Sequence, residues 1–215
     1  MFWKHKSNNA MEIEAKFSVP DIEIYNQLKQ MDHLAGFELS ASKEKQVIDT
    51  YVDTDDRLIL NAGYGCRKRV QPDGLLVTLK GLGTIDGAVH RREEWEVLLT
   101  TDQPPTHWPD SPVRERVKQI IGGAALQPLV QLAQTRIVQF IYQDQRRMAE
   151  LSLDSVRLAV QGKEQAYFEL EIELIPPESE ALLVNLVSTL QQNFHLQPET
   201  RSKFERALSF IDTYS

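Results

Sequence analysis

Residues 169–173 read Glu-Leu-Glu-Ile-Glu, and residues 12–16 read Glu-Ile-Glu-Ala-Lys. Side chains alternate between the two faces of a β-strand, so each segment would have one charged face and one apolar face. The segment Glu94-Trp95-Glu96 follows the same pattern. These stretches predict strands whose apolar side packs in a core and whose other side carries carboxylates.

Basic side chains alternate on two neighbouring segments, 65–70 and 75–80. Arg67 and Arg69 share a face of the first segment, and Lys80 lies on the second. The triplet Pro-Asp-Gly between the two segments is typical of a turn. The two segments are therefore predicted to form a β-hairpin.

Alternation and helical spacing predict the other elements. Further strands are expected at residues 44–51, 89–99, 132–142, 148–156 and 167–175. Helices are expected at residues 22–34, 111–121, 178–193 and 202–213, the first with Asp21 as its cap and Gly36 as its stop. Because no linker of flexible composition interrupts this series, residues 11–215 are expected to form one domain after a loose leader at residues 1–10.

The composition is that of a folded soluble chain. Of the 215 residues, 26% are charged and 41% hydrophobic, which excludes a disordered or collagen-like chain. Uncharged stretches such as residues 120–135 contain glycine, proline and glutamine, and none approaches the roughly 20 apolar residues that cross a bilayer. Residues 1–10 lack the apolar middle region of a secretory signal. We therefore expect a cytoplasmic protein without a membrane partner.

Net charge and rare residue types limit the possible partners. The formal charge of −7 disfavours nucleic acid as a partner, because phosphate backbones usually meet a net basic face. The single cysteine, Cys66, cannot form an internal disulfide or a thiolate metal site and is expected in the core. The histidines, at positions 5, 33, 90, 107 and 195, lack a metal-binding spacing and are expected on the surface or in loops. The oligomeric state stays open.

Strand faces made only of glutamate, or only of arginine and lysine, have two interpretations. The simpler one is a solvated outer sheet face, although such faces usually mix charges with Thr, Ser and Gln. If the sheet instead closes into a barrel with these faces inward, acidic and basic rows face each other across a lumen. Charges buried in this way are too costly unless they are wet or bind a highly charged ligand. This second interpretation indicates a tunnel for a polyanion, with carboxylates around a hard divalent cation and Arg and Lys on phosphate oxygens.

The order of these residues along the chain resembles the CYTH superfamily, the triphosphate tunnel metalloenzymes. The residues that carry the resemblance are Glu12, Glu14, Lys16, Arg67, Arg69, Thr78, Lys80, Glu94, Glu96, Arg136, Asp154, Glu169, Glu171, Glu173, Ser202 and Lys203. The resemblance implies an α+β fold: a closed antiparallel eight-stranded β-barrel that forms a triphosphate tunnel, with helices packed outside. It also implies metal-dependent hydrolysis or rearrangement of a small-molecule triphosphate, with Mg²⁺ or Mn²⁺ as cofactor.

The resemblance also implies a role for each residue. The metal ligands would be Glu12 and Glu14, with two of the three residues Glu169, Glu171 and Glu173. The substrate-binding residues would be Lys16, Arg67, Arg69, Lys80, Arg136 and Lys203. The catalytic residues would be Glu94, Glu96 and Asp154, which position the attacking water or a second metal, together with Lys16. The alternative for Arg136 and Asp154 is an ordinary strand surface or a structural ion pair.

Three activities stay open: an inorganic triphosphatase, an organic-triphosphate enzyme such as thiamine triphosphatase or class IV adenylate cyclase, and a non-catalytic polyphosphate-binding module. Trp95 alternates away from the glutamates and Trp108 lies in a proline-rich connection, so no stacking site for an organic group is evident. This favours inorganic tripolyphosphate. The glutamates would weaken a simple anion binder unless metal bridges them, which disfavours the binding module. We expect the chain to stand alone, without the domain of helical histidine repeats that is fused to some relatives.

Overall fold

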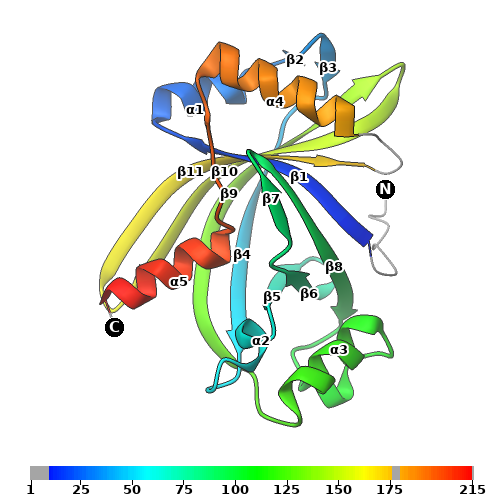
Figure 1. Cartoon of the computed structure of the whole chain (residues 1–215), viewed down its shortest axis with the longest axis vertical. Helices are drawn as coiled ribbons and strands as arrows, with labels where there is room; N and C mark the ends of the chain where they lie inside the picture. Colours follow the sequence, from blue (N-terminus) through cyan, green and yellow to red (C-terminus); the bar gives the residue numbers. More distant parts are fainter. Residues whose placement is uncertain (1–9, 176–179, 215) are drawn as a thin grey trace.

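Eight antiparallel strands form a closed barrel in the computed structural model, which describes residues 10–175 and 180–214 (Figure 1). The barrel strands are β1 (Ala10–Val19), β4 (Lys43–Asp53), β5 (Tyr64–Gln71), β6 (Gly74–Gly81), β8 (Val89–Leu99), β9 (Gln127–Gln143), β10 (Arg146–Val160) and β11 (Lys163–Leu174). Their order around the barrel is β10, β11, β1, β8, β6, β5, β4, β9, and β9 pairs back with β10. The predicted closed barrel is confirmed.

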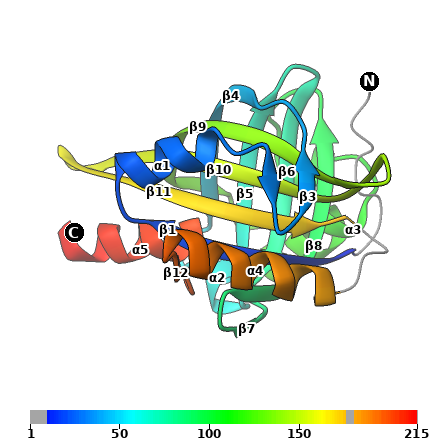
Figure 2. The same cartoon turned by 90° about the horizontal axis from the view of Figure 1, so that it is seen from above.

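Short strands and helices lie outside the barrel, as Figure 2 shows from above. The strands are β2 (His33–Leu34), β3 (Phe37–Leu39), β7 (Thr84–Asp86) and β12 (Gln197–Pro198). The helices are α1 (Ile22–Lys29), α2 (Leu58–Asn61), α3 (Pro112–Ile121), α4 (Glu180–Phe194) and α5 (Lys203–Tyr214), with a 3₁₀ turn η1 at Pro105–His107. The predicted α+β fold with helices outside a barrel is confirmed.

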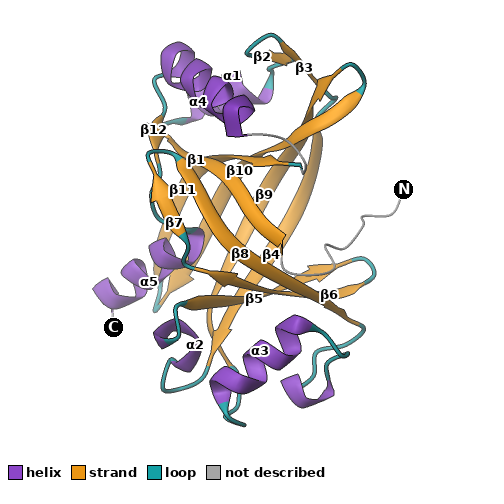
Figure 3. Ribbon diagram, turned by 45° about the vertical axis from the view of Figure 1, so that its right-hand side comes forward, coloured by secondary structure: helices purple, strands orange, loops and turns teal. Residues whose placement is uncertain are grey.

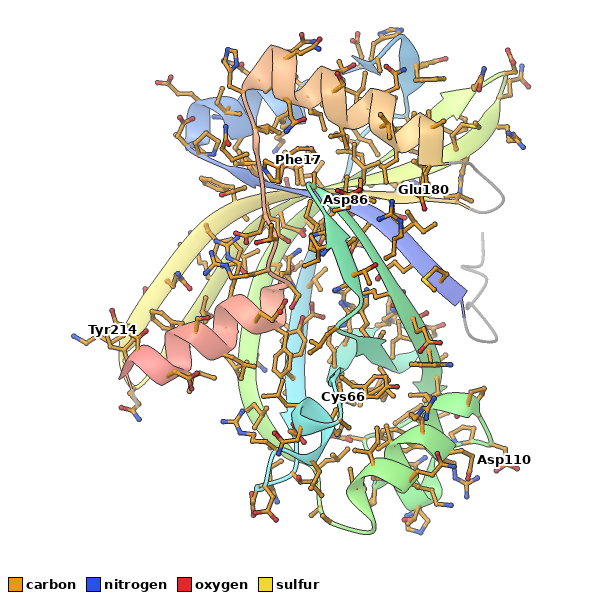
Figure 4. The ribbon with its side chains drawn as sticks, viewed as in Figure 1. Phe17, Cys66, Asp86, Asp110, Glu180 and Tyr214 are labelled. Carbon is orange, nitrogen blue, oxygen red and sulfur yellow. The ribbon has the colours of Figure 1, made fainter. Side chains whose placement is uncertain are left out.

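Two apolar cores hold helices against the outside of the barrel. Figure 3 shows α1 and α4 at one end, and α2 and α3 at the other. The first core joins Phe17 of β1 to Leu28 of α1 and Leu186 of α4, and the second joins Cys66 of β5 to Val117 of α3. Figure 4 labels Phe17 and Cys66 in these two regions. Because the apolar strand faces pack outward, the charged faces are left for the interior of the barrel.

A third apolar core lies inside one end of the barrel. It packs Tyr51 and Leu132, on inner strand faces, against Phe204 of α5. The rings of Tyr51 and Phe204 stack with their centroids 4.6 Å apart. A Cβ atom at Gly65 would lie 3.0 Å from the Phe204 ring, so glycine at this position allows α5 to approach β5 closely. The packing places Lys203, the first residue of α5, in contact with the interior.

Local signals placed several elements correctly. In the predicted hairpin, Gln71 pairs with Gly74, which leaves a two-residue turn between β5 and β6. The side chain of Ser111 accepts the N–H of Arg114 at 3.3 Å and caps α3. The predicted leader falls outside the described residues except for Ala10, which already belongs to β1, and the predicted helix start at residue 178 also falls outside them.

The end of the first helix was predicted wrongly. Asp21 caps α1 by accepting the N–H of Ile24 at 2.8 Å, as predicted, but the helix ends at Lys29. Ala35 and Gly36 both have positive φ, at 52° and 83°, and form the two-residue turn of the hairpin between β2 and β3. Gly36 was predicted to end the helix but lies in this turn. The helical spacing of the apolar residues before it continues beyond Lys29 and led to the wrong prediction.

Candidate active site

Charged side chains fill the interior of the barrel. Those that are buried are Glu12, Glu14, Lys16, Asp49, Arg92, Glu94, Arg136, Asp154, Glu169 and Lys203. Others on the inner faces are partly exposed: Arg67, Arg69, Lys80, Glu96, Glu171 and Glu173. A solvated outer sheet face is therefore the wrong interpretation, because every residue predicted for the site lies on the inner face of its strand or at the start of α5. The cavity around the outward pair Lys68 and Asp102 lies outside the barrel.

Two cations hold the carboxylates of β1. Lys80 Nζ donates to both oxygens of Glu12, at 2.7 and 3.0 Å, and lies 3.3 Å from Oε1 of Glu94. Arg92 Nε donates to Oε2 of Glu12 at 2.7 Å, and its Nη2 donates to Oε1 of Glu14. Arg92 therefore bridges the two glutamates that were predicted to bind metal.

Two ammonium groups meet at one carboxylate of β11. Lys16 Nζ donates to Oε1 of Glu171 at 2.5 Å and lies 3.4 Å from Oε1 of Glu14. Lys203 Nζ donates to the same oxygen of Glu171 at 2.8 Å, and to Oε1 of Glu169 at 2.5 Å. Residues far apart in the sequence, Lys16 in β1 and Lys203 at the start of α5, thus share one partner.

Arg136 and Asp154 form a buried bidentate pair between β9 and β10. Arg136 Nε donates to Oδ1 of Asp154 at 2.7 Å, and Nη2 donates to Oδ2 at 2.5 Å. The same Nη2 reaches Oε2 of Glu171 at 2.8 Å. The ion pair considered as an alternative for these residues is therefore present, but it lies inside the barrel beside the other charged groups.

A third set of contacts centres on Asp49 of β4. Arg69 of β5 donates to it through Nε and Nη2, at 2.6 and 2.7 Å. Gln134 of β9 donates to its Oδ2 at 2.7 Å, and Arg67 Nη1 lies 3.7 Å from the same oxygen. Arg67 Nη2 also donates to the hydroxyl of Thr78 on β6, at 3.2 Å. Asp49 thus joins Arg67 and Arg69, the two arginines of β5 that were predicted to bind phosphate.

Burial and ion pairing together set the pKa values in the interior. Burial alone would raise the pKa of Glu12, but Lys80 and Arg92 hold it well below 4.5. Burial alone would lower the pKa of Lys203, but Glu169 and Glu171 hold it well above 10.5. For Glu169 burial prevails over Lys203 and the pKa is raised. The interior is therefore a network of charged pairs, and Glu169 is a carboxylate in it whose pKa is raised by burial.

Sequence reasoning missed Arg92 and Asp49. A signal for Arg92 existed, because it shares the inner face of β8 with Glu94 and Glu96, which were singled out. Asp49 shares one face of β4 with Val47 and Tyr51, a pattern typical of an ordinary strand. Its function as a partner of Arg69 depends on the β4–β5 register, in which the two residues are directly opposite each other.

The prediction for the histidines was wrong at His90. This residue is buried in β8, and its Nε2 lies 2.9 Å from the backbone oxygen of Glu199. The period of two in β8 places His90 on the same inner face as Arg92, so it contributes to the barrel wall. Burial and the nearby Lys16 lower its pKa.

The chain matches the model of the CYTH domain over residues 10–208. It belongs to the CYTH domain family. Comparison with functionally curated proteins gave no match. Within the described ranges, the helices of this CYTH domain are too short or too polar to cross a membrane.

Solved structures share the fold of this CYTH domain. A putative adenylyl cyclase from Hippeastrum with a dominant triphosphatase activity is 21% identical, with a TM-score of 0.70 and coverage of 93% of this chain and 96% of its own. A putative adenylate cyclase from Bacillus halodurans is 20% identical, with a TM-score of 0.59 and coverage of 92% and 97%. The capping-enzyme triphosphatase of mimivirus is 14% identical, with a TM-score of 0.52 and coverage of 86% and 92%. At these identities the likeness establishes the fold alone.

The donor chemistry of this CYTH domain fits a divalent cation. Glu14 of β1 is directly opposite Glu173 of β11, and Glu173 is directly opposite Glu150 of β10. Like charges at opposing positions repel each other, and carboxylate oxygens are the ligands that Mg²⁺ and Mn²⁺ prefer. Among the residues described, no three acidic, His or Cys side chains are already gathered as a metal site. Arg92 and Lys80 neutralise the carboxylates of β1 in this arrangement.

Proposed function

We propose that this CYTH domain hydrolyses a triphosphate, specifically inorganic tripolyphosphate, inside its barrel and with Mg²⁺ or Mn²⁺. One observation carries the proposal: basic and acidic side chains from all eight barrel strands and from the start of α5 converge in the interior of a closed barrel, roughly in balance. Phosphoryl transfer is promoted mainly by cations and positioning, which such an interior can supply without a covalent nucleophile.

The basic residues are proposed to bind the phosphates by exchanging partners. The set is Lys16, Arg67, Arg69, Lys80, Arg136 and Lys203. Each now contacts a carboxylate inside the barrel, at 2.5 to 3.7 Å. Phosphate oxygens would replace those carboxylate oxygens as acceptors of the same donors. The exchange leaves glutamates without their cations, and a buried carboxylate without a partner is costly.

A divalent cation would take over the glutamates that lose their partners. We assign Glu12, Glu14 and Glu173 as its ligands, with Glu169 and Glu171 as the further candidates. Glu173 is preferred on β11 because it is directly opposite Glu14 in the register of β1 and β11. When bound, the cation supplies charge to offset the phosphates and to activate water.

Glu94 and Glu96 are proposed to position the attacking water. Both lie on the inner face of β8, where Lys80 approaches Glu94 and the hydroxyl of Thr78 donates to Glu96 at 3.2 Å. Asp154 was grouped with them on the sequence, but both of its oxygens are engaged by Arg136. We therefore assign Asp154 to holding Arg136 in place, which leaves water activation to the two glutamates of β8.

The aromatic residues support an inorganic substrate. Trp95 and Trp108 pack in the outer core beside α3. Tyr51 and Phe204 stack on each other, and the guanidinium of Arg206 lies 3.4 Å from the centre of the Tyr167 ring. These rings already have partners, so stacking of a nucleobase or thiazolium ring would have to displace them.

Phosphate release from tripolyphosphate, pyrophosphate, ATP and thiamine triphosphate tests the proposal. Each substrate is incubated with Mg²⁺, with Mn²⁺ and with excess chelator, and ATP reactions are also assayed for cyclic AMP. We expect metal-dependent release that is fastest with tripolyphosphate. The variant Glu12→Gln, purified identically, controls for a contaminating phosphatase.

The outcomes separate the three activities. Faster turnover of thiamine triphosphate, or formation of cyclic AMP, would replace the inorganic substrate by an organic one. Tight tripolyphosphate binding without release from any substrate would indicate a binding module. Full activity with excess chelator would reject the metal.

A further inference from the structure

Asp49 of β4 has no exposed surface, and the proposed hydrolysis does not use it as a metal ligand or as a phosphate-binding residue. Its two oxygens accept three hydrogen bonds, two from Arg69 and one from Gln134. These partners come from β5 and β9, the two strands that flank β4 in the barrel. Asp49 is therefore fixed from both sides.

The pairing leaves part of each arginine available to a ligand. Arg69 uses Nε and Nη2 for Asp49, so its Nη1 is directed away from that pair. Arg67 donates through Nη2 to Thr78, and its Nη1 lies 3.7 Å from Asp49. Its Nε is buried and has no hydrogen-bond partner within the described part of the chain. A guanidinium with a buried, unused donor is suited to an incoming anionic oxygen.

Electrostatic repulsion alone would make Asp49 weaken the binding of a phosphate ligand. A carboxylate inside a site for a polyanion repels it, so its presence should weaken binding. Burial would raise the pKa of Asp49, but Arg67 and Arg69 hold it below its ordinary value of 3.8, so the group is charged at neutral pH. A charged Asp49 beside these two arginines favours phosphate binding only if the gain from holding the arginines in place exceeds the repulsion between Asp49 and the phosphates.

We propose that Asp49 is a positioning residue, which orients Arg69 and Arg67 for the phosphates of the substrate. Both guanidinium groups are on long side chains that would otherwise adopt many conformations. The bidentate pair with Asp49 holds Arg69 in one of them, and so reduces the conformational entropy lost when phosphate binds. The inference rests on the proposed triphosphate site.

Binding of a methylene-bridged tripolyphosphate analogue with Mg²⁺, measured by calorimetry, tests the inference. The variants are Asp49→Asn, Asp49→Glu, Arg69→Ala and the double variant Asp49→Asn with Arg69→Ala. The control Asp102→Asn makes the same chemical change in an exposed ion pair with Lys68 on the outer side of the barrel. Near-ultraviolet circular dichroism reports whether each variant keeps the native packing.

Asp49→Asn is expected to raise the dissociation constant about tenfold or more, the usual scale for losing an oriented charged hydrogen bond. It should lose most of this effect in the Arg69→Ala background, because residues that act through each other are not additive. Asp102→Asn should leave binding unchanged. A tighter complex with Asp49→Asn would show that the carboxylate only repels the ligand and would overturn the inference.

Four further outcomes would also count against the proposals. If Asp49→Asn loses its native packing, Asp49→Glu carries the same test, because it keeps the charge and shifts the position; unchanged binding by it would overturn the inference. Equal weakening by Asp49→Asn with and without Arg69 would also overturn it.

The wild type separates this inference from the proposed function. If the wild type does not bind the analogue, the triphosphate site itself is wrong and both proposals are rejected. Binding by the wild type with no loss in Asp49→Asn rejects the positioning role alone.

Discussion

Arg92 is directly opposite Glu12 in the register of β8 and β1, and its Nε donates to Oε2 of that glutamate at 2.7 Å. The other end of the guanidinium donates to Glu14. Both side chains of the pair are at most 8% exposed. In the free protein, a cation of the chain itself therefore occupies the carboxylates that we assign to a divalent metal.

Removal of Arg92 is expected to strengthen metal binding by the protein without substrate. In Arg92→Gln, Glu12 and Glu14 lose the guanidinium that neutralises them, so Mn²⁺ meets less competition for their oxygens. Titration of Mn²⁺ followed by electron paramagnetic resonance should give a lower dissociation constant than in the wild type. An unchanged or weaker affinity would show that Arg92 does not compete with the metal.

Glu12→Gln and Glu173→Gln are each expected to lower tripolyphosphate turnover at limiting metal by at least roughly tenfold, as is typical when a metal site loses part of its support. An amide is nearly isosteric with the carboxylate but is an uncharged and poorer ligand. Glu93→Gln is the matched control, because Glu93 lies on the outward face of β8. A near-normal rate in either inner variant would remove that residue from the metal ligands.

Arg69→Ala is expected to weaken binding of a non-hydrolysable triphosphate by about 1.5–3 kcal/mol, the scale of hydrogen bonds to charged groups. The control is Lys68→Ala, since Lys68 immediately precedes Arg69 in β5 and contacts Asp102 at 2.6 Å on the outer side. Calorimetry measures both variants. Equal and minor losses would contradict a phosphate site on the inner face of β5.

Acid is expected to destabilise the fold through the inner carboxylates. The pKa of Glu171 is held well below 4.5, against the effect of burial, by Lys16, Lys203 and Arg136. A carboxylate whose pKa is lowered on folding stabilises the folded state above its unfolded value, and this contribution is lost as the pH falls below 4.5 toward the folded value. Urea unfolding between about pH 7 and about pH 3 should therefore show a falling free energy of unfolding.

The variant Glu171→Gln isolates the contribution of Glu171 to the pH dependence of the free energy of unfolding. The variant cannot titrate at this position, so it should be less stable than the wild type at neutral pH and the two stabilities should converge in acid. Glu169, whose pKa is raised by burial, has the opposite pH dependence and limits the loss of stability in acid of both proteins. A constant difference between the wild type and Glu171→Gln across the pH range would contradict the assignment.

Much of the fold follows from local patterns in the sequence. Alternation identified the strands of Glu12 and Glu171 and separated their inner from their outer residues, because a strand repeats every two residues whatever it pairs with. The turn before Gly74 and the cap at Asp21 also depend on neighbouring residues alone. Gly36 shows the limit of such signals, since a glycine with positive φ suits both a helix stop and a hairpin turn.

The pairing inside the barrel was decided only by the tertiary structure. Asp49 and Arg69 are 20 residues apart, and Lys203 and Glu169 are 34 apart, yet each pair makes a direct ion pair. The sequence shows which charges share the face of one strand, but not which of them meet across strands or with α5. Register, strand order and closure of the barrel set those distances, and they result from packing over the whole chain rather than from the residues near each charge.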